Sequence, residues 1–129
     1  MSAATAPEET AHQFRIKRVY APADKADGLR VLVDRLWPRG IAKKKARIDL
    51  WLKDIAPSDA LRRRVHGDPT KWKEFLVDYR HELAREPARS AVARLRELAD
   101  RGPVTLLFAA RNEARNNAIA LRSFLEGKE

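Results

Sequence analysis

The chain has 129 residues, of which 44% are hydrophobic and 35% are charged, with a net charge of +9, which predicts one globular domain with a heavily charged surface. It contains no apolar run near the ~20 residues of a membrane span, and its amino terminus lacks the apolar core of an export signal. It has no cysteine for a disulfide, a thiolate ligand or a nucleophile. We therefore expect a cytoplasmic protein that does not enter a membrane.

The first half of the chain predicts two strands after a short tail. Residues 1–12 are small and polar without periodicity, which indicates a disordered tail, so we place a single domain at residues 13–127. Gln13–Tyr20 alternates apolar side chains and predicts a first strand. Val31–Leu36 predicts a second strand, and its nearly continuous apolar run indicates burial on both faces. Residues 49–53 fit either a short strand or a helix end.

The second half predicts helices around one more strand. Ser58 or Asp59 suits the start of a short helix through Val65, and Pro87 suits the first position of a longer one. A helix between them carries one apolar stripe formed by Trp72, Phe75, Leu76, Tyr79 and Leu83. Val104–Ala109 is the clearest strand, and a polar loop at 111–116 leads into a last helix.

This order of elements predicts an α/β fold. We expect a mostly parallel sheet of about four strands flanked by helices, with Rossmann-like layering. Ligands of such sheets collect outside the carboxyl ends of the strands, which places the loop after Leu36 and the loop after Ala109 on one rim. The second loop also precedes a helix N-terminus, where free N–H groups and the helix dipole favour an anion.

The positive charge is concentrated beside this rim. Residues 30–48 hold seven basic residues and one acidic residue, Asp34, for a net charge of +6. Such a concentration indicates an anionic partner, either a phosphate-bearing small molecule or a nucleic-acid backbone. The alternative is a solvated basic loop that keeps the protein soluble.

The first candidate cluster follows the second strand. Arg35 and Arg39 can hold a phosphate or carboxylate, Trp37 can stack on a ring, and Asp34 can transfer a proton. In the structural alternative, Asp34 pairs with an arginine at the strand end while Trp37 covers the core.

The second candidate cluster precedes the last helix. Arg111 can hold an anion, Glu113 can act as a general base, and Asn112, Asn116 and Asn117 can orient a ligand. In the structural alternative, Asn112 or Asn116 caps the helix, Glu113 faces the helix dipole and Arg111 is solvated.

Other chemistry finds little support. His66 and Asp68 share one turn, whereas convincing metal sites need three or four ligands, so we predict no metal. The rim loops offer no serine, threonine or cysteine nucleophile, and no phosphate or dinucleotide glycine fingerprint is present, so no cofactor is predicted. The basic runs Lys43–Lys45 and Arg62–Arg64 allow a nucleic-acid-binding module without enzymatic activity, although the helices lack helix-turn-helix spacing.

The run Val31–Gly40 (VLVDRLWPRG) resembles the domain of unknown function 488 family, specifically its YeaO-like branch. The resemblance covers roughly residues 14 to 126 and includes IKRVY at 16–20, DLWLKDIAPS at 49–58, Asp68-Pro69, Trp72, Phe75 and VTLL at 104–107. It implies an α/β fold and no established activity. Members of this family usually carry a histidine after the asparagine that opens the last helix, whereas this chain has Asn117 there. The resemblance therefore does not imply an imidazole base or metal ligand here.

Two functions follow as hypotheses. The preferred one is a small anionic ligand, such as a nucleotide or phosphorylated metabolite, held by Arg35, Arg39 and Arg111, with any catalysis left to Asp34 or Glu113. The other is a basic nucleic-acid-binding or regulatory module. The sequence leaves the oligomeric state open.

Overall fold

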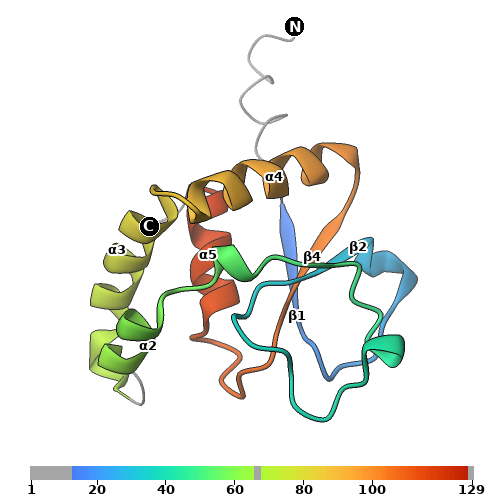
Figure 1. Cartoon of the computed structure of the whole chain (residues 1–129), viewed down its shortest axis with the longest axis horizontal. Coiled ribbons are helices and arrows are strands. Elements are labelled where there is room, and N and C mark those ends of the chain that lie inside the picture. The colour runs from blue at the N-terminus through green and yellow to red at the C-terminus, as the bar shows by residue number, and fades with distance from the viewer. Residues whose placement is uncertain (1–12, 66–67, 128–129) are drawn as a thin grey trace, which may run out of the picture.

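A computed structural model of the chain describes residues 13–65 and 68–127. These residues form a small α/β domain around a four-stranded sheet (Figure 1). The strands are β1 (Phe14–Arg18), β2 (Leu29–Leu32), β3 (Leu50–Trp51) and β4 (Val104–Phe108). The α-helices are α2 (Asp59–Val65), α3 (Trp72–Leu83), α4 (Ala88–Arg101) and α5 (Asn117–Leu125).

The last strand in sequence lies in the middle of the sheet. The strand order is β1-β4-β2-β3, and all three neighbouring pairs are parallel. Every residue of β4 is buried, because β1 and β2 flank it and both of its faces are covered. This explains why residues 104–108 are apolar or uncharged without alternation.

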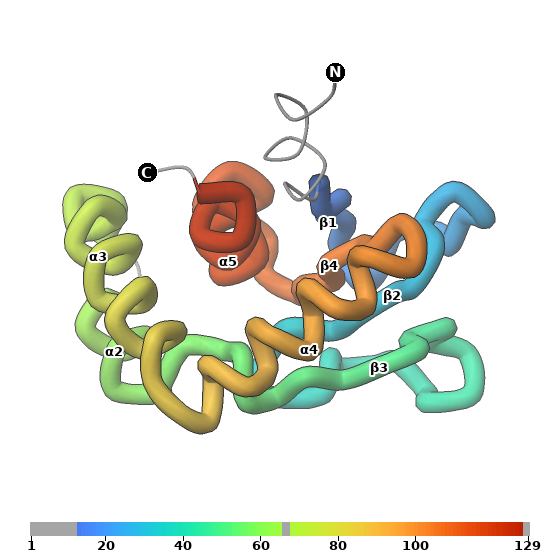
Figure 2. Tube along the Cα trace, turned by 90° about the horizontal axis from the view of Figure 1, so that it is seen from above, coloured from blue at the N-terminus to red at the C-terminus, as the bar shows by residue number. Residues whose placement is uncertain are grey.

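The two faces of the sheet have different covers. Alternate strand residues such as Val31, Leu106 and Phe108 belong to one core cluster with the buried side chains of the four α-helices. The opposite face holds Leu32 and Leu107, which pack with side chains of the segment 37–51. Figure 2 shows α3 and α5 together on one side of the sheet. A long loop with one short 3-10 helix, η3 (Lys43–Lys45), therefore covers the face where a Rossmann domain carries further helices.

The predicted fold class is confirmed, and most predicted elements are present with small shifts in their ends. The ambiguous segment at 49–53 contributes the short strand β3, followed by the 3-10 helix η4 (Lys53–Ile55). Pro87 precedes the first residue of α4 instead of occupying it. The tail proposed for residues 1–12 lies outside the described residues.

The second strand differs most from its prediction. Val31–Leu36 was expected, whereas β2 runs from Leu29 to Leu32. Val33 still donates its backbone N–H to the Leu107 carbonyl oxygen at 3.1 Å, but the chain then leaves the sheet. Leu36 is 69% exposed, so it is not part of a buried strand. The apolar run gave no sign of this turn because its physical cause is a side-chain contact of Asp34, described below.

The loop before β2 carries a buried ion-pair cluster centred on Asp27. Its carboxylate accepts hydrogen bonds from the Lys17 ammonium at 2.8 Å, the Arg30 guanidinium at 2.5 Å and the Asp24 backbone N–H at 3.0 Å. Burial alone would raise the pKa of Asp27, but these donors outweigh it and lower the pKa below its ordinary value. The Asp27 carbonyl accepts from the Thr105 hydroxyl at 2.7 Å, which ties this loop to β4.

No helix in the described part of the chain is long and apolar enough to cross a membrane.

Candidate functional site

The carboxyl ends of the strands form one edge of the domain. In Figure 1 the loop after β2 and the loop after β4 both emerge at this edge, away from α4. We call this edge the rim and define it by residues 18–20, 34–39 and 109–117. The parallel pairing brings these three segments together although the first and the last lie about ninety residues apart in sequence.

Asp34 joins two of the three rim segments. Its Oδ2 accepts a hydrogen bond from the Ala109 backbone N–H at 2.9 Å, and its Oδ1 accepts one from the Asn117 side-chain amide at 3.0 Å. The same amide nitrogen donates to the Val33 carbonyl oxygen at 3.1 Å. Asp34 therefore holds the end of β2 against the end of β4 and the first residue of α5.

The surroundings of Asp34 favour its neutral form. Burial raises the pKa of its carboxyl group above the ordinary value of 3.8, whereas the hydrogen bonds from Asn117 and Ala109 and the positive charge of Arg62 oppose that rise. A carboxyl group with a raised pKa is a candidate for proton transfer. Both of its oxygens, however, already accept hydrogen bonds from the protein.

Trp37 of the rim and Trp51 of β3 both have structural contacts in this arrangement. The indole N–H of Trp37 donates to the Ile41 carbonyl at 2.7 Å, and that of Trp51 donates to the Asp34 carbonyl at 2.7 Å. Their rings meet edge to face with centroids 5.4 Å apart. Trp37 packs against the second core cluster, so its ring covers the sheet and supports the structural alternative for this residue.

The three arginines expected to hold an anion do not converge. Arg35 is exposed and turns towards α2, where its guanidinium lies 3.2 Å from the Asp59 carboxylate. Arg39 and Arg111 are exposed on the loops after β2 and β4. The side chain of Arg35 thus points towards α2, whereas Arg39 and Arg111 lie on the two rim loops.

Arg18 and Tyr20, which the sequence did not single out, connect the loops that carry Arg39 and Arg111. The Arg18 guanidinium donates to the Ala109 carbonyl at 2.9 Å and the Ala110 carbonyl at 3.0 Å. It also lies over the Tyr20 ring, 4.9 Å from its centroid, and the Tyr20 hydroxyl donates to the Arg39 carbonyl at 3.0 Å. Tyr20 remains 44% exposed. Only the predicted topology could have indicated these two residues, because the end of the first parallel strand also belongs to the rim.

The asparagines before α5 shape the loop. Asn112 accepts hydrogen bonds from the backbone N–H groups of Ala114 and Arg115 at 2.9 and 3.0 Å. Asn116 is buried, donates to the Asn112 carbonyl and caps α5 by accepting from the Ile119 N–H at 2.9 Å. Asn116 therefore caps the last helix, as its structural alternative holds, whereas Asn112 uses its side-chain oxygen to shape the loop before that helix.

The remaining candidates offer little chemistry. Glu113 is exposed on the loop, and no contact joins it to Asp34 in the described structure. No group of three or more metal-ligating side chains occurs among the residues that the structure describes. His66 lies outside those residues. Asp68 accepts from the N–H and the hydroxyl of Thr70 and so caps the 3-10 helix η5 (Pro69–Lys71).

Comparison with known proteins decides the family. Residues 13–129 match the profile of a family described as the inactive DUF488-N3 subclade. The chain belongs to this DUF488 subclade. It is 44% identical over 112 residues to the uncharacterized protein YeaO of Escherichia coli (strain K12), and the aligned residues cover 87% of this chain and 96% of that protein. It is also 44% identical over 116 residues to the uncharacterized protein Rv3073c of Mycobacterium tuberculosis (strain H37Rv), and this alignment covers 90% of this chain and 96% of that protein. No solved structure matches the chain.

The expected resemblance to the YeaO-like branch is confirmed by these matches. The position of Asn117 is important for two reasons. Its side-chain amide contacts the Asp34 carboxylate, and the resemblance implies a histidine at this position. An amide does not take up a proton near neutral pH. The rim of this DUF488 protein therefore carries a carboxylate–amide pair, with Asn117 at the position where the resemblance implies a histidine.

Proposed function

We propose that this DUF488 protein is a non-catalytic binding domain that holds a small anionic ligand on the rim of its sheet. The observation that carries this proposal is the Arg18–Tyr20 bridge. Through it, the Tyr20 hydroxyl is bonded to the backbone of Arg39, and Arg18, whose guanidinium lies over the exposed Tyr20 ring, is bonded to the residue preceding Arg111. Among the described residues, neither Arg39 nor Arg111 has an ion-pair partner, so both guanidinium groups are available to a ligand.

The chemistry of these groups suits a phosphate-bearing ligand. A guanidinium group donates to two oxygens of one phosphate in a fixed fork, which fits Arg39 and Arg111 better than a role in solubility alone. Tyr20 offers a half-exposed ring whose hydroxyl is already fixed, so a base or sugar ring can stack without ordering a mobile side chain. A nucleotide carries both features.

Three observations favour binding without catalysis. Asn117 provides no titrating partner for Asp34, and both Asp34 oxygens are engaged by the protein. Glu113 lies exposed on a loop, and no hydrogen bond or ion pair from another described residue fixes its carboxylate. The subclade to which the chain belongs is described as inactive. A cytoplasmic location stays a prediction from the sequence.

The test is a calorimetric titration at low ionic strength with inorganic phosphate and with a nucleoside monophosphate. We expect both Arg39→Ala and Arg111→Ala to weaken nucleotide binding about fivefold or more, the effect of losing a contact that contributes about 1 kcal/mol. Arg94→Ala is the matched control, because Arg94 is an exposed arginine on α4, away from the rim. If neither compound binds, or if the rim variants bind like Arg94→Ala, the proposal is wrong.

A nucleic-acid partner is the second candidate, favoured by the exposed basic helix η3 (Lys43–Lys45). The ammonium group of Lys43 lies 5.9 Å from the centroid of Trp37, so η3 sits against the loop that carries Arg39. A single-stranded oligonucleotide would bridge η3 and the rim, and its affinity would fall steeply with salt. Replacing all three lysines by alanine should then reduce that salt dependence, but should leave binding of a nucleoside monophosphate unchanged.

A further inference from the structure

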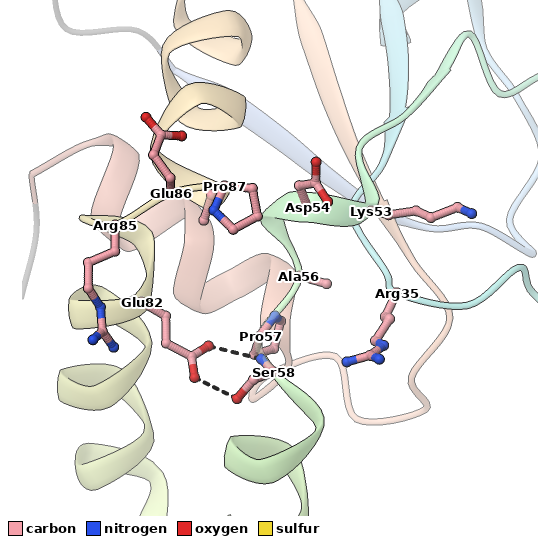
Figure 3. Close-up of a pocket in the computed structure, with 11 residues that line it drawn as sticks. Arg35, Lys53, Asp54, Ala56, Pro57, Ser58, Glu82, Arg85, Glu86 and Pro87 are labelled. Carbon is pink, nitrogen blue, oxygen red and sulfur yellow. Dashed lines mark hydrogen bonds between the residues drawn. The ribbon is translucent and has the colours of Figure 1, made fainter.

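A groove of about 690 Å³ lies beside the rim, between the end of α3 and the segment that follows β3. Its floor is formed by Ala56, Pro57 and Ala88, of which Pro57 and Ala88 are buried. Figure 3 shows charged side chains around this floor, contributed by η4, by the end of α3 and by Arg35. Small-molecule sites in proteins typically occupy about 300–1,000 Å³, so the groove has the size of a ligand site.

The charges of the lining balance. It contains three bases, Arg35, Lys53 and Arg85, and three acids, Asp54, Glu82 and Glu86. A simple anion or cation gains little from such a surface, because each attraction is offset by a repulsion nearby. A ligand that carries both signs of charge can use it.

Most of these groups already have partners in the protein. Arg35 pairs with Asp59 at 3.2 Å, and the Lys53 ammonium lies 4.3 Å from the centroid of the Trp51 ring. The Glu82 carboxylate accepts from the N–H and hydroxyl of Ser58 at 2.9 and 2.5 Å. The Glu86 carboxylate, which precedes α4, lies 3.1 Å from Arg89 Nε and accepts from the Ser90 hydroxyl at 2.7 Å, and both of these partners belong to α4.

Two opposite charges remain uncommitted. Among the described residues, the Arg85 guanidinium and the Asp54 carboxylate have neither an ion pair nor a side-chain hydrogen bond. They come from different segments, since Figure 3 shows Arg85 next to the end of α3, beyond Glu82, and Asp54 on η4 near Ala56. Both residues are exposed, so a ligand can reach their charged groups.

We propose that this groove binds a short peptide with free termini. Its α-carboxylate would accept hydrogen bonds from Arg85, its α-ammonium group would donate to Asp54, and its small side chains would pack on Ala56, which is partly exposed. The volume of about 690 Å³ exceeds what a single amino acid fills, which favours a peptide of a few residues. This site is separate from the anion site on the rim, because it uses neither Arg39 nor Arg111.

Tripeptides of alanine test the proposal by titration calorimetry. Trialanine with free termini is compared with its N-acetylated form and with its C-terminal amide, each of which lacks one charge. We expect each modification to weaken binding about fivefold, as the loss of one exposed ion pair does. Arg85→Ala should weaken trialanine and the N-acetylated form but leave the amide unchanged. Asp54→Ala should weaken trialanine and the amide but leave the N-acetylated form unchanged.

The controls keep the charge changes matched. Arg94→Ala and Glu97→Ala remove one positive and one negative charge from exposed positions of α4 outside the groove, and both should bind trialanine like the unaltered protein. Thermal melts of all variants exclude unfolding as a cause. Absence of trialanine binding, or equal loss with all three peptides in either groove variant, overturns the proposal. Because Arg39→Ala should leave trialanine binding unchanged, failure here is distinct from failure of the rim proposal.

Discussion

Asp34→Ala tests whether Asp34 holds the rim together. The substitution removes the acceptor of the Ala109 N–H at 2.9 Å and of the Asn117 amide at 3.0 Å. Hydrogen bonds to a charged group contribute about 1.5–3 kcal/mol each. Part of this is offset by the cost of keeping the carboxylate out of water, which its raised pKa reflects. We expect a net loss of about 2 kcal/mol in the free energy of unfolding.

The assay is chemical unfolding, which gives the free energy of unfolding, together with thermal unfolding, both followed by circular dichroism. A loss of about 2 kcal/mol corresponds to a melting temperature lowered by roughly 6–10 °C in a domain of this size. Asp34→Asn should cost less, because the new amide oxygen still accepts from Ala109 and no charge has to be desolvated. If Asp34→Ala were as stable as the unaltered protein, the two hydrogen bonds would not be what fixes the loops.

The pH dependence of the same variants has a defined sign. Since burial raises the pKa of Asp34 above 3.8, the folded protein binds this proton more tightly than the unfolded chain does. Its contribution is therefore most favourable below the unfolded pKa and is lost as the pH rises through the higher, folded pKa. The Asp34→Asn variant should therefore gain stability relative to the unaltered protein as the pH rises from about 4 to neutral. A constant difference, or a shift in the opposite direction, would refute this reasoning.

Three further substitutions address other contacts. Asp27→Asn should lower the free energy of unfolding by about 3 kcal/mol, because it leaves buried cations without a charged partner. Since the pKa of Asp27 is lowered in the folded state, urea melts should show this contribution above the unfolded pKa and its loss as the pH falls through the folded pKa. Tyr79→Phe should cost about 1–3 kcal/mol in the same assay by leaving the buried Ile55 carbonyl without its hydroxyl donor. Asn117→His should give an imidazole whose pKa, measured by NMR titration, lies above its ordinary value because Asp34 is its neighbour; a value at or below the ordinary one would contradict that pairing.

The elements that the sequence predicts well are those whose patterns come from burial alone. The stripe of Phe75, Tyr79 and Leu83 is buried in α3, and the apolar run of β4 is buried throughout. The end of β2 was predicted wrongly, because it depends on Asp34 contacting Ala109, a residue 75 positions away. No local pattern contains that contact. The least predictable parts of this fold are therefore the ends of helices and strands whose positions are set by side-chain contacts.

The candidate site shows the same division. The rule for parallel sheets brought Asp34 and Asn117 to one edge, where the structure has them in contact. Residue type alone did not determine which side chains are free. Trp37, with its N–H bonded to Ile41, packs on the sheet, whereas Tyr20, from an unremarked strand end, is the ring left exposed. Such roles depend on partners that only the folded chain supplies.

The run Val31–Gly40 was the strongest reason to expect chemistry at the rim. The contacts of its side chains give a structural reason for the same residue types. An acid, two arginines and a tryptophan next to a buried strand are also what a loop needs in order to be fixed against a sheet. Asp34 binds β4 and α5, Arg35 pairs with α2, and Trp37 closes its own loop. With these side chains engaged, ligand binding has to rest on groups that the scaffold leaves free. In the described part of the chain these groups include Arg39 and Arg111 on the rim, and Arg85 and Asp54 in the groove, which is why both proposed tests are made there.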